Sequence, residues 1–151
     1  MEKLKIAGLE GKTRRIVVEA QFNPKEIEIE KAVPWQRQPK KGPADLEFSA
    51  GQPKTMDFEL MFDGAESGSS IQDEIDKLHA FSSIDTGLKR PPKLKVVWGQ
   101  EGAEGVMPKF DAVIEALAVK YLLFDAHGRP LRATVRLRFK EANHLMVGKP
   151  T

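Results

Sequence analysis

Two carboxylates, Asp57 and Glu59, stand two residues apart in a segment that alternates apolar and polar side chains. In an extended strand this spacing puts both carboxylates on one face, roughly 6–7 Å apart, where a pair could perform general acid–base chemistry. The structural interpretation is stronger, because an alternating strand face is usually solvated or bridged to cations. The chain supplies a suitable row of cations at Arg132, Arg136, Arg138 and Lys140.

The other reactive residue types form no recognisable site. The histidines, His79, His127 and His144, lie far apart without metal-ligand spacing. The chain has no cysteine and no serine in a nucleophile-elbow setting, and segment 64–68 lacks the Gly-Lys-Ser/Thr ending of a phosphate-binding loop. The sequence therefore predicts a protein that is not an enzyme and that uses no metal or other cofactor.

The cation row needs its own explanation, since like charges on one strand face repel each other unless partners or solvent compensate them. One explanation is an acidic surface on a neighbouring subunit, which the Asp57 and Glu59 face could provide. A second is a polyanion such as nucleic acid, and a third is a row that is merely solvated. Nucleic acid is not the expected partner, because the aromatic residue of this segment, Phe139, falls on the inward face, away from any base.

The cations are predicted to lie on one long strand. Apolar and polar residues alternate from Leu131 to Lys140, the pattern of a strand with one face on a core. Residues 125–130 contain the Gly and Pro of a chain reversal, and the apolar segment 110–124 precedes them. These segments predict a long hairpin at the C-terminal end of the domain.

Alternation in residues 55–62 predicts a second strong strand, with Asp57 and Glu59 on its outer face. After it, apolar residues at spacings of four and three predict one helix over 71–81. Ser69 and Ser70 are its expected N-cap, and Thr86-Gly87 its expected end. Further strands are predicted at 94–98, in an N-terminal hairpin of 4–6 with 15–20, and at 26–30.

Residues 31–53 contain four prolines and several cations, which predicts a long, mostly irregular arm. Such connections are usually functional or disordered, so we expect this arm to contact another chain. The predicted domain spans residues 1–141, with a tail at 142–151. Its fold class is mainly β with one helix: an antiparallel β-barrel or sandwich with a flanking α-helix. The arm residues expected at a contact are Trp35, Arg37, Lys40 and Lys41.

Composition narrows the function classes. The chain has 151 residues, 24 basic against 22 acidic side chains and a formal net charge of +2, so its bulk charge does not indicate a nucleic-acid or membrane partner. The N-terminus lacks the apolar run of a signal peptide, and no stretch approaches the ~20 apolar residues of a membrane helix. We expect assembly in a bacterial cytoplasm.

Four segments in order resemble the contractile injection system tube protein family. This family is best known as the N-terminal part of LysM-containing tube-initiator or baseplate-hub proteins of phage-tail-like particles. The resemblance covers the chain from about Leu4 to Glu141, and we expect no LysM module in the remaining residues 142–151. The segments are FNP at 22–24, MDFELMFD at 56–63, RPPKLKVVWG at 90–99 and GRPLRA at 128–133.

The resemblance implies a tail-tube fold and a structural role at the junction of baseplate and inner tube. It implies a ring of six copies, with the spike or hub protein and the inner tube protein as further partners. The particle would be released or membrane-anchored. The arm and the charged strand faces are then expected at the subunit interface or the lumen. The alternative is a standalone β-barrel module that binds nucleic acid or another polyanion.

Overall fold

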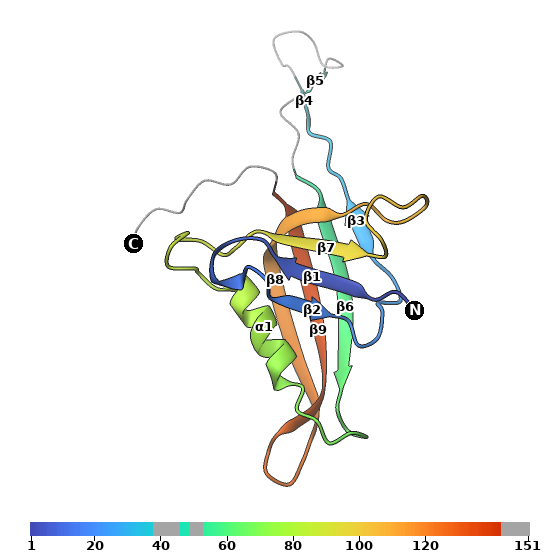
Figure 1. The fold of residues 1–151 in the computed structure, drawn as a ribbon. Coiled ribbons are helices and arrows are strands. Elements are labelled where there is room, and N and C mark those ends of the chain that lie inside the picture. Colours follow the sequence, from blue (N-terminus) through green and yellow to red (C-terminus); the bar gives the residue numbers. More distant parts are fainter. Residues whose placement is uncertain (38–45, 49–52, 143–151) are drawn as a thin grey trace.

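Two long strands at the C-terminal end of the chain form the centre of the fold. They are seen in a computed structural model, which describes residues 1–37, 46–48 and 53–142 (Figure 1). The strands are β1 (Leu4–Gly8), β2 (Val17–Glu19), β3 (Glu28–Glu30), β4 (Trp35–Arg37), β5 (Leu46–Phe48), β6 (Thr55–Asp63), β7 (Leu94–Trp98), β8 (Phe110–Phe124) and β9 (Pro130–Glu141). The helices are the 3-10 turn η1 (Gly11–Thr13) and α1 (Gln72–Ser82).

Seven of these strands form one sheet in the order β2-β1-β7-β8-β9-β6-β3, and every neighbouring pair is antiparallel. Strands β1, β2 and β7 lie across the long strands β8, β9 and β6, and α1 packs beside them (Figure 1). The predicted fold class, mainly β with one helix, is confirmed. The sheet is open and does not close into a barrel, so of the two predicted arrangements the sandwich is nearer.

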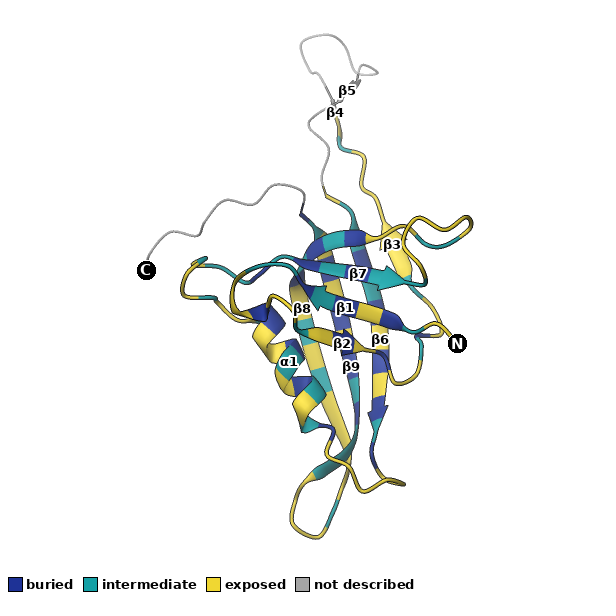
Figure 2. Cartoon of the chain, viewed as in Figure 1, coloured by how far each residue is buried: buried dark blue, intermediate teal, exposed yellow. Residues whose placement is uncertain are grey.

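The alternation read from β6 and β9 is confirmed by burial (Figure 2). On β6 the side chains of Met56, Phe58, Leu60 and Phe62 are buried; on β9 those of Ala133, Val135, Leu137 and Phe139 are buried. The Phe58 and Phe139 rings stack at 5.5 Å between centroids. Because a strand repeats every two residues, one buried face fixes the register, and the polar residues of both strands are forced outward.

The predicted hairpin is formed by β8 and β9, joined by a turn at residues 125–129. The Asp125 carboxylate accepts hydrogen bonds from the backbone N–H groups of His127 and Arg129 and from Arg129 Nε. These hydrogen bonds, that from the Arg129 N–H foremost, lower the pKa of Asp125. Gly128 has φ 78°, a conformation that glycine adopts without steric cost. The turn therefore sets the pairing that follows it.

The helix is confirmed, but its two ends differ from the prediction. Ile75, Leu78 and Phe81 are buried as the apolar stripe requires. The N-cap position falls on Ile71 instead of a serine, and no side chain caps it; the Ser70 hydroxyl accepts only the N–H of Gln72. The helix ends at Ser82 rather than near Thr86-Gly87. It stops there because Ser83 is extended and donates its hydroxyl to the carbonyl of His79.

A carboxylate–guanidinium pair joins the N-terminal turn to the segment after the helix. Arg90 Nη1 and Nη2 donate to the two carboxylate oxygens of Glu10 at 3.0 and 2.9 Å, and the backbone N–H of Lys93 donates to the same carboxylate at 2.8 Å. The hydrogen bond from Arg90 is the main reason that the pKa of Glu10 lies below its usual value. This bidentate geometry fixes two loops 80 residues apart.

A glutamine side chain connects the two ends of the open sheet. Gln21, just after β2, donates its Nε2 to the carbonyl of Asp63 and accepts the Asp63 N–H, both at 2.8 Å. The carboxamide thus pairs with the end of β6 as another strand's backbone would. The edge of β6 is covered at this one position without a further strand.

The predicted irregular arm contains a short ladder. Trp35 to Arg37 pairs antiparallel with Leu46 to Phe48 as a separate two-stranded sheet, β4 and β5. The prediction of a mostly irregular arm missed this pairing, because the prolines and cations of the segment hide its alternation. Lys40 and Lys41 lie outside the described residues, as does the predicted tail from residue 143 onward. In the part that is described, no helix is long and apolar enough to cross a membrane.

Candidate assembly surfaces

The outer face of β3, β6 and β9 carries most of the residues singled out by the sequence. Cross-strand neighbours bring Glu28, Asp57 and Arg138 side by side, and Glu59 opposite Arg136. Neighbours in register share a face. We call this surface the charged face; its members are Glu28, Glu30, Asp57, Glu59, Asp63, Arg132, Arg136, Arg138 and Lys140.

Acidic and basic residues of the charged face pair with each other inside one chain. Arg138 Nε donates to Asp57 at 2.8 Å, and Arg132 Nε donates to Asp63 at 3.0 Å. Both arginine side chains are about half exposed, 51% and 41%. The Asp57 carboxylate raises the pKa of Arg138. These contacts supply the compensation that a row of like charges requires.

For Arg132 and Arg138, the acidic partner predicted on a neighbouring subunit thus lies on β6 of the same chain. Lys140 reaches Glu115 of β8 at 3.9 Å. Arg136 faces Glu59 in register, yet no ion pair joins them among the residues that the structure describes. Arg132, Arg138 and Lys140 each have an acidic partner within the chain. Arg136 is therefore the cation of the row best placed to pair with an acidic group on another molecule. A role at an interface or in a lumen stays a prediction for all of them.

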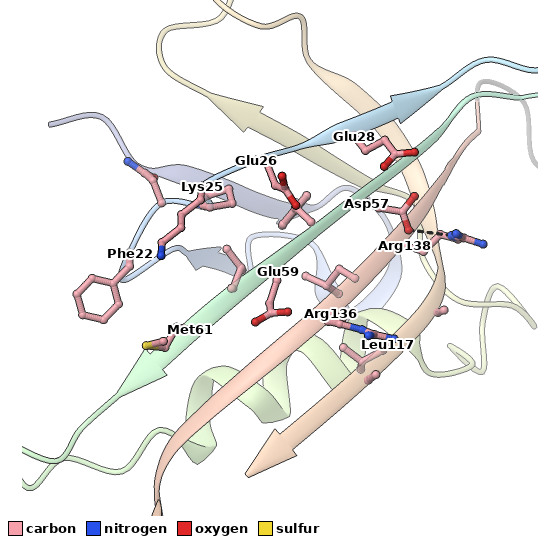
Figure 3. Close-up of a pocket in the computed structure, with 17 residues that line it drawn as sticks. Phe22, Lys25, Glu26, Glu28, Asp57, Glu59, Met61, Leu117, Arg136 and Arg138 are labelled. Atoms are coloured by element: carbon pink, nitrogen blue, oxygen red, sulfur yellow. Dashed lines mark hydrogen bonds and ion pairs between the residues drawn. The ribbon is translucent and has the colours of Figure 1, made fainter. Parts of the chain in front are cut away.

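A shallow groove of about 1190 Å³ runs over this face (Figure 3). The segment from Phe22 to Glu28 forms one side, and β6, β9 and β8 form its floor. Ala116 and Ala118 of β8 stand beside Arg138 and Arg136 in register, and their small side chains leave the floor low. Phe22 is 49% exposed at its rim. An open groove of this kind suits an extended partner rather than an enclosed small molecule.

The groove does not assemble reactive groups. Asp57 is engaged by Arg138, and Glu59 lies on the exposed sheet face, where water screens its charge. In residues 1–37, 46–48 and 53–142, no cluster of His, Cys, Asp or Glu has the composition to hold a metal ion. Phe139 is buried, as the argument against base stacking expects. The surface presents paired charges beside an open groove.

Two surfaces lie outside the charged face. Trp35 is 57% exposed on the arm, and Arg37 follows it in β4. The second surface, which was not predicted from the sequence, is the exposed end of β8 from Tyr121 to Phe124. Four consecutive apolar residues break the alternation expected of a half-buried strand, and that break was the available signal.

Comparison with known proteins agrees with this picture of an assembling β domain. The family model described as contractile injection system tube protein matches residues 1–146. The chain belongs to this family. It is therefore a structural tube protein of a contractile injection system, part of a phage-tail-like particle. Among curated proteins, none matches the sequence significantly.

Proposed function

We propose that this chain forms a ring of six copies at the junction of baseplate and inner tube, where it initiates or extends the inner tube. Membership of the tube family supports a structural role in the tube. The ring's partners would be further copies of the chain, a spike or hub protein on one side and the inner tube protein on the other. The six-copy ring and its position are implied by the family resemblance.

The observation that carries the ring is a pair of unmatched sheet edges. Strand β7 pairs with β8 only at Phe110 to Ala112, and β3 pairs with β6 only at Thr55 to Asp57. Within the described residues, β8 from residue 113 and β6 from 58 to 62 have no strand on their outer sides. Such edges expose unpaired N–H and C=O groups. The two edges lie on opposite sides of β9, so a neighbour on each side gives a head-to-tail contact that can close into a ring.

The packing of the sheet suggests which face turns to the channel. Strands β1, β2 and β7 and helix α1 occupy the inner face of β8, β9 and β6 (Figure 1). If the long strands of neighbouring copies join edge to edge around an axis, the layer of β1, β2, β7 and α1 has room only on the outer side of the ring. The charged face would then line the channel, and its internal ion pairs would keep its charges nearly balanced. The arm, with Trp35, Arg37, Lys40 and Lys41, would reach a neighbouring subunit.

The alternative is a standalone module that binds nucleic acid or another polyanion. The cation row of β9 motivates it, but two of its arginines are already paired with aspartates. Salt-dependent phosphate binding needs Lys or Arg side chains that can neutralise phosphates, because that neutralisation releases the counterions condensed on the nucleic acid. The ring therefore has the stronger support.

Light scattering and negative-stain imaging of the purified full chain test the proposal. Sixfold rings or stacked tubes are the expected result. A monomer that binds single-stranded oligonucleotides, with affinity falling steeply as salt rises, would overturn the proposal in favour of the alternative.

Reversing Arg136 and Arg138 to glutamate is the companion experiment. If the charged face lines the channel, rings persist and only the channel's charge changes. If rings are lost while circular dichroism shows a folded chain, the charged face is a subunit contact instead.

A further inference from the structure

The far end of the β8–β9 hairpin carries four consecutive apolar residues that the core does not cover. Tyr121, Leu122, Leu123 and Phe124 are 37%, 45%, 37% and 55% exposed. Register shifts between Tyr121 and Leu123 and between Leu123 and Phe124 break the alternation, so apolar side chains emerge on both faces of the ribbon. Figure 2 shows this end of the hairpin extending past the rest of the sheet. We call these four residues the hairpin end.

A second exposed apolar surface lies at the opposite end of the long strands. Val33 is 49% exposed and Trp35 57%, on the segment that leads from β3 into β4. This segment leaves the sheet near the pair of Thr55 with Lys140, at the end of β9 far from its turn. In Figure 1, β4 and β5 lie beyond one end of the sheet and the β8–β9 turn lies beyond the other. We call Val33 and Trp35 the arm end.

The two ends carry opposite charge. Of the described residues between positions 31 and 54, three are basic (Lys31, Arg37 and Lys54) and one, Glu47, is acidic, whereas residues 63–76 contain five acidic and no basic ones. The acidic segment lies beside the hairpin end, because the Tyr121 hydroxyl donates to Gln72 Oε1 at 3.2 Å. Two of its five acids are ion-paired within the chain. In the described part of the chain, those without an ion pair are Glu66, Asp73 and Asp76.

We propose that the arm end of one copy packs against the hairpin end of a second copy, placed next along the strand axis. The partner is this same chain, and the contact joins exposed apolar residues inside a rim of complementary charge. The inference rests on the proposed function, since it supplies the axial contact by which rings of this chain would stack.

Three physical points favour this partner. First, both surfaces are apolar and solvent-exposed, so bringing them together removes apolar area from water. Second, the surfaces are different and lie at opposite ends of the long strands (Figure 1), so the contact can repeat along one axis and give a stack. Third, a separate two-stranded hairpin such as β4–β5 is marginally stable in water, so docking on a second copy would stabilise it.

The absence of cysteine from the sequence allows a direct test by cross-linking. Two single-cysteine variants, Val33→Cys and Phe124→Cys, are prepared as full chains, mixed and treated with a short bismaleimide. The expected product is a covalent dimer that contains one copy of each variant, distinguished by a mass tag. The matched control replaces Val33→Cys with Ile84→Cys, because Ile84 is 70% exposed and belongs to neither end. The control mixture should give no dimer above background.

The outcomes separate this contact from the ring. Sixfold rings without the mixed dimer would overturn the contact and leave the proposed function standing. A mixed dimer without rings would support the contact and count against the ring. A dimer formed by Phe124→Cys alone would overturn the inference, since it would mean that hairpin ends meet each other. Replacing Asp73 and Asp76 by lysine should sharply reduce the mixed dimer, because it places cations opposite the basic arm.

Discussion

Removing the carboxylate of Glu10 tests how firmly the N-terminal turn is held to the segment after the helix. In the Glu10→Ala variant, Arg90 loses two charge-assisted hydrogen bonds, and the Lys93 N–H loses its acceptor. Hydrogen bonds to charged groups contribute about 1.5–3 kcal/mol each when buried. Here the side chains of Glu10 and Arg90 are 26% and 15% exposed, so solvent weakens the pair. We expect the free energy of unfolding to fall by about 2–3 kcal/mol, between the values for buried and exposed pairs.

The assay is urea and thermal unfolding of the monomeric chain. For a chain of this size the expected loss corresponds to a drop in Tm of about 4–12 °C. The matched control is Glu101→Ala, because Glu101 also forms an ion pair, with Lys95 at 3.1 Å, but its side chain is 46% exposed. An exposed pair contributes about 0–1 kcal/mol, so the control should change stability far less.

The dependence on pH gives a second readout of the same pair. The pKa of Glu10 is lowered in the folded protein, chiefly by Arg90. A lowered carboxyl pKa stabilises the fold above the unfolded pKa, near 4.3, and this stabilisation is lost as pH falls through the folded pKa. The stability difference between wild type and Glu10→Ala should therefore be constant near neutral pH and shrink in acid. A double-mutant cycle with Arg90→Ala that gave a coupling energy below about 0.5 kcal/mol would refute the reasoning.

Two further predictions concern the core and the open sheet. Phe81→Ala removes a fully buried ring of α1 and should cost about 3–5 kcal/mol in urea unfolding, whereas Ile84→Ala, at a 70% exposed position, should stay within about 0.5 kcal/mol; equal effects would mean that α1 is not packed as described. Gln21→Ala removes the acceptor of the Asp63 N–H, so hydrogen exchange at the Asp63 amide should accelerate in this variant while amides at the centre of β9 are unchanged.

The local pattern of apolar and polar residues was sufficient to predict the elements that bury one face. The alternation of β6 and β9 and the stripe of α1 each follow from a single period in the sequence. The C-terminal end of α1 was not predictable in this way, because the helix stops where Ser83 is extended and its hydroxyl donates to the carbonyl of His79. Helix ends depend on such individual contacts more than on periodicity.

The sequence was sufficient to predict which charged residues lie on the candidate site. It was not sufficient to predict which of them pair with each other. Charges were expected on the outer faces of β6 and β9, and they lie there. That Asp57 pairs with Arg138 depends on the register of two strands 81 residues apart, and nothing local in either strand specifies which cation meets which acid. The exposure of the hairpin end was not predicted for a related reason. Register shifts near Leu122 and Leu123 decide which face of the sheet each side chain occupies.

The strand order has a consequence for how the chain reaches its native state. Strand β9 separates β8 from β6 in the sheet, and of the described strands it comes last along the chain. Strand β1 pairs with β2 nearby, but its other partner is β7, where Leu4 meets Trp98. The side chains of Leu4, Ile6 and Val18 are buried in the folded protein. During synthesis they therefore stay exposed to solvent until the later strands have been made. Pairings between distant segments fold slowly, and the early hairpin has to remain unaggregated until β9 joins the two halves of the sheet.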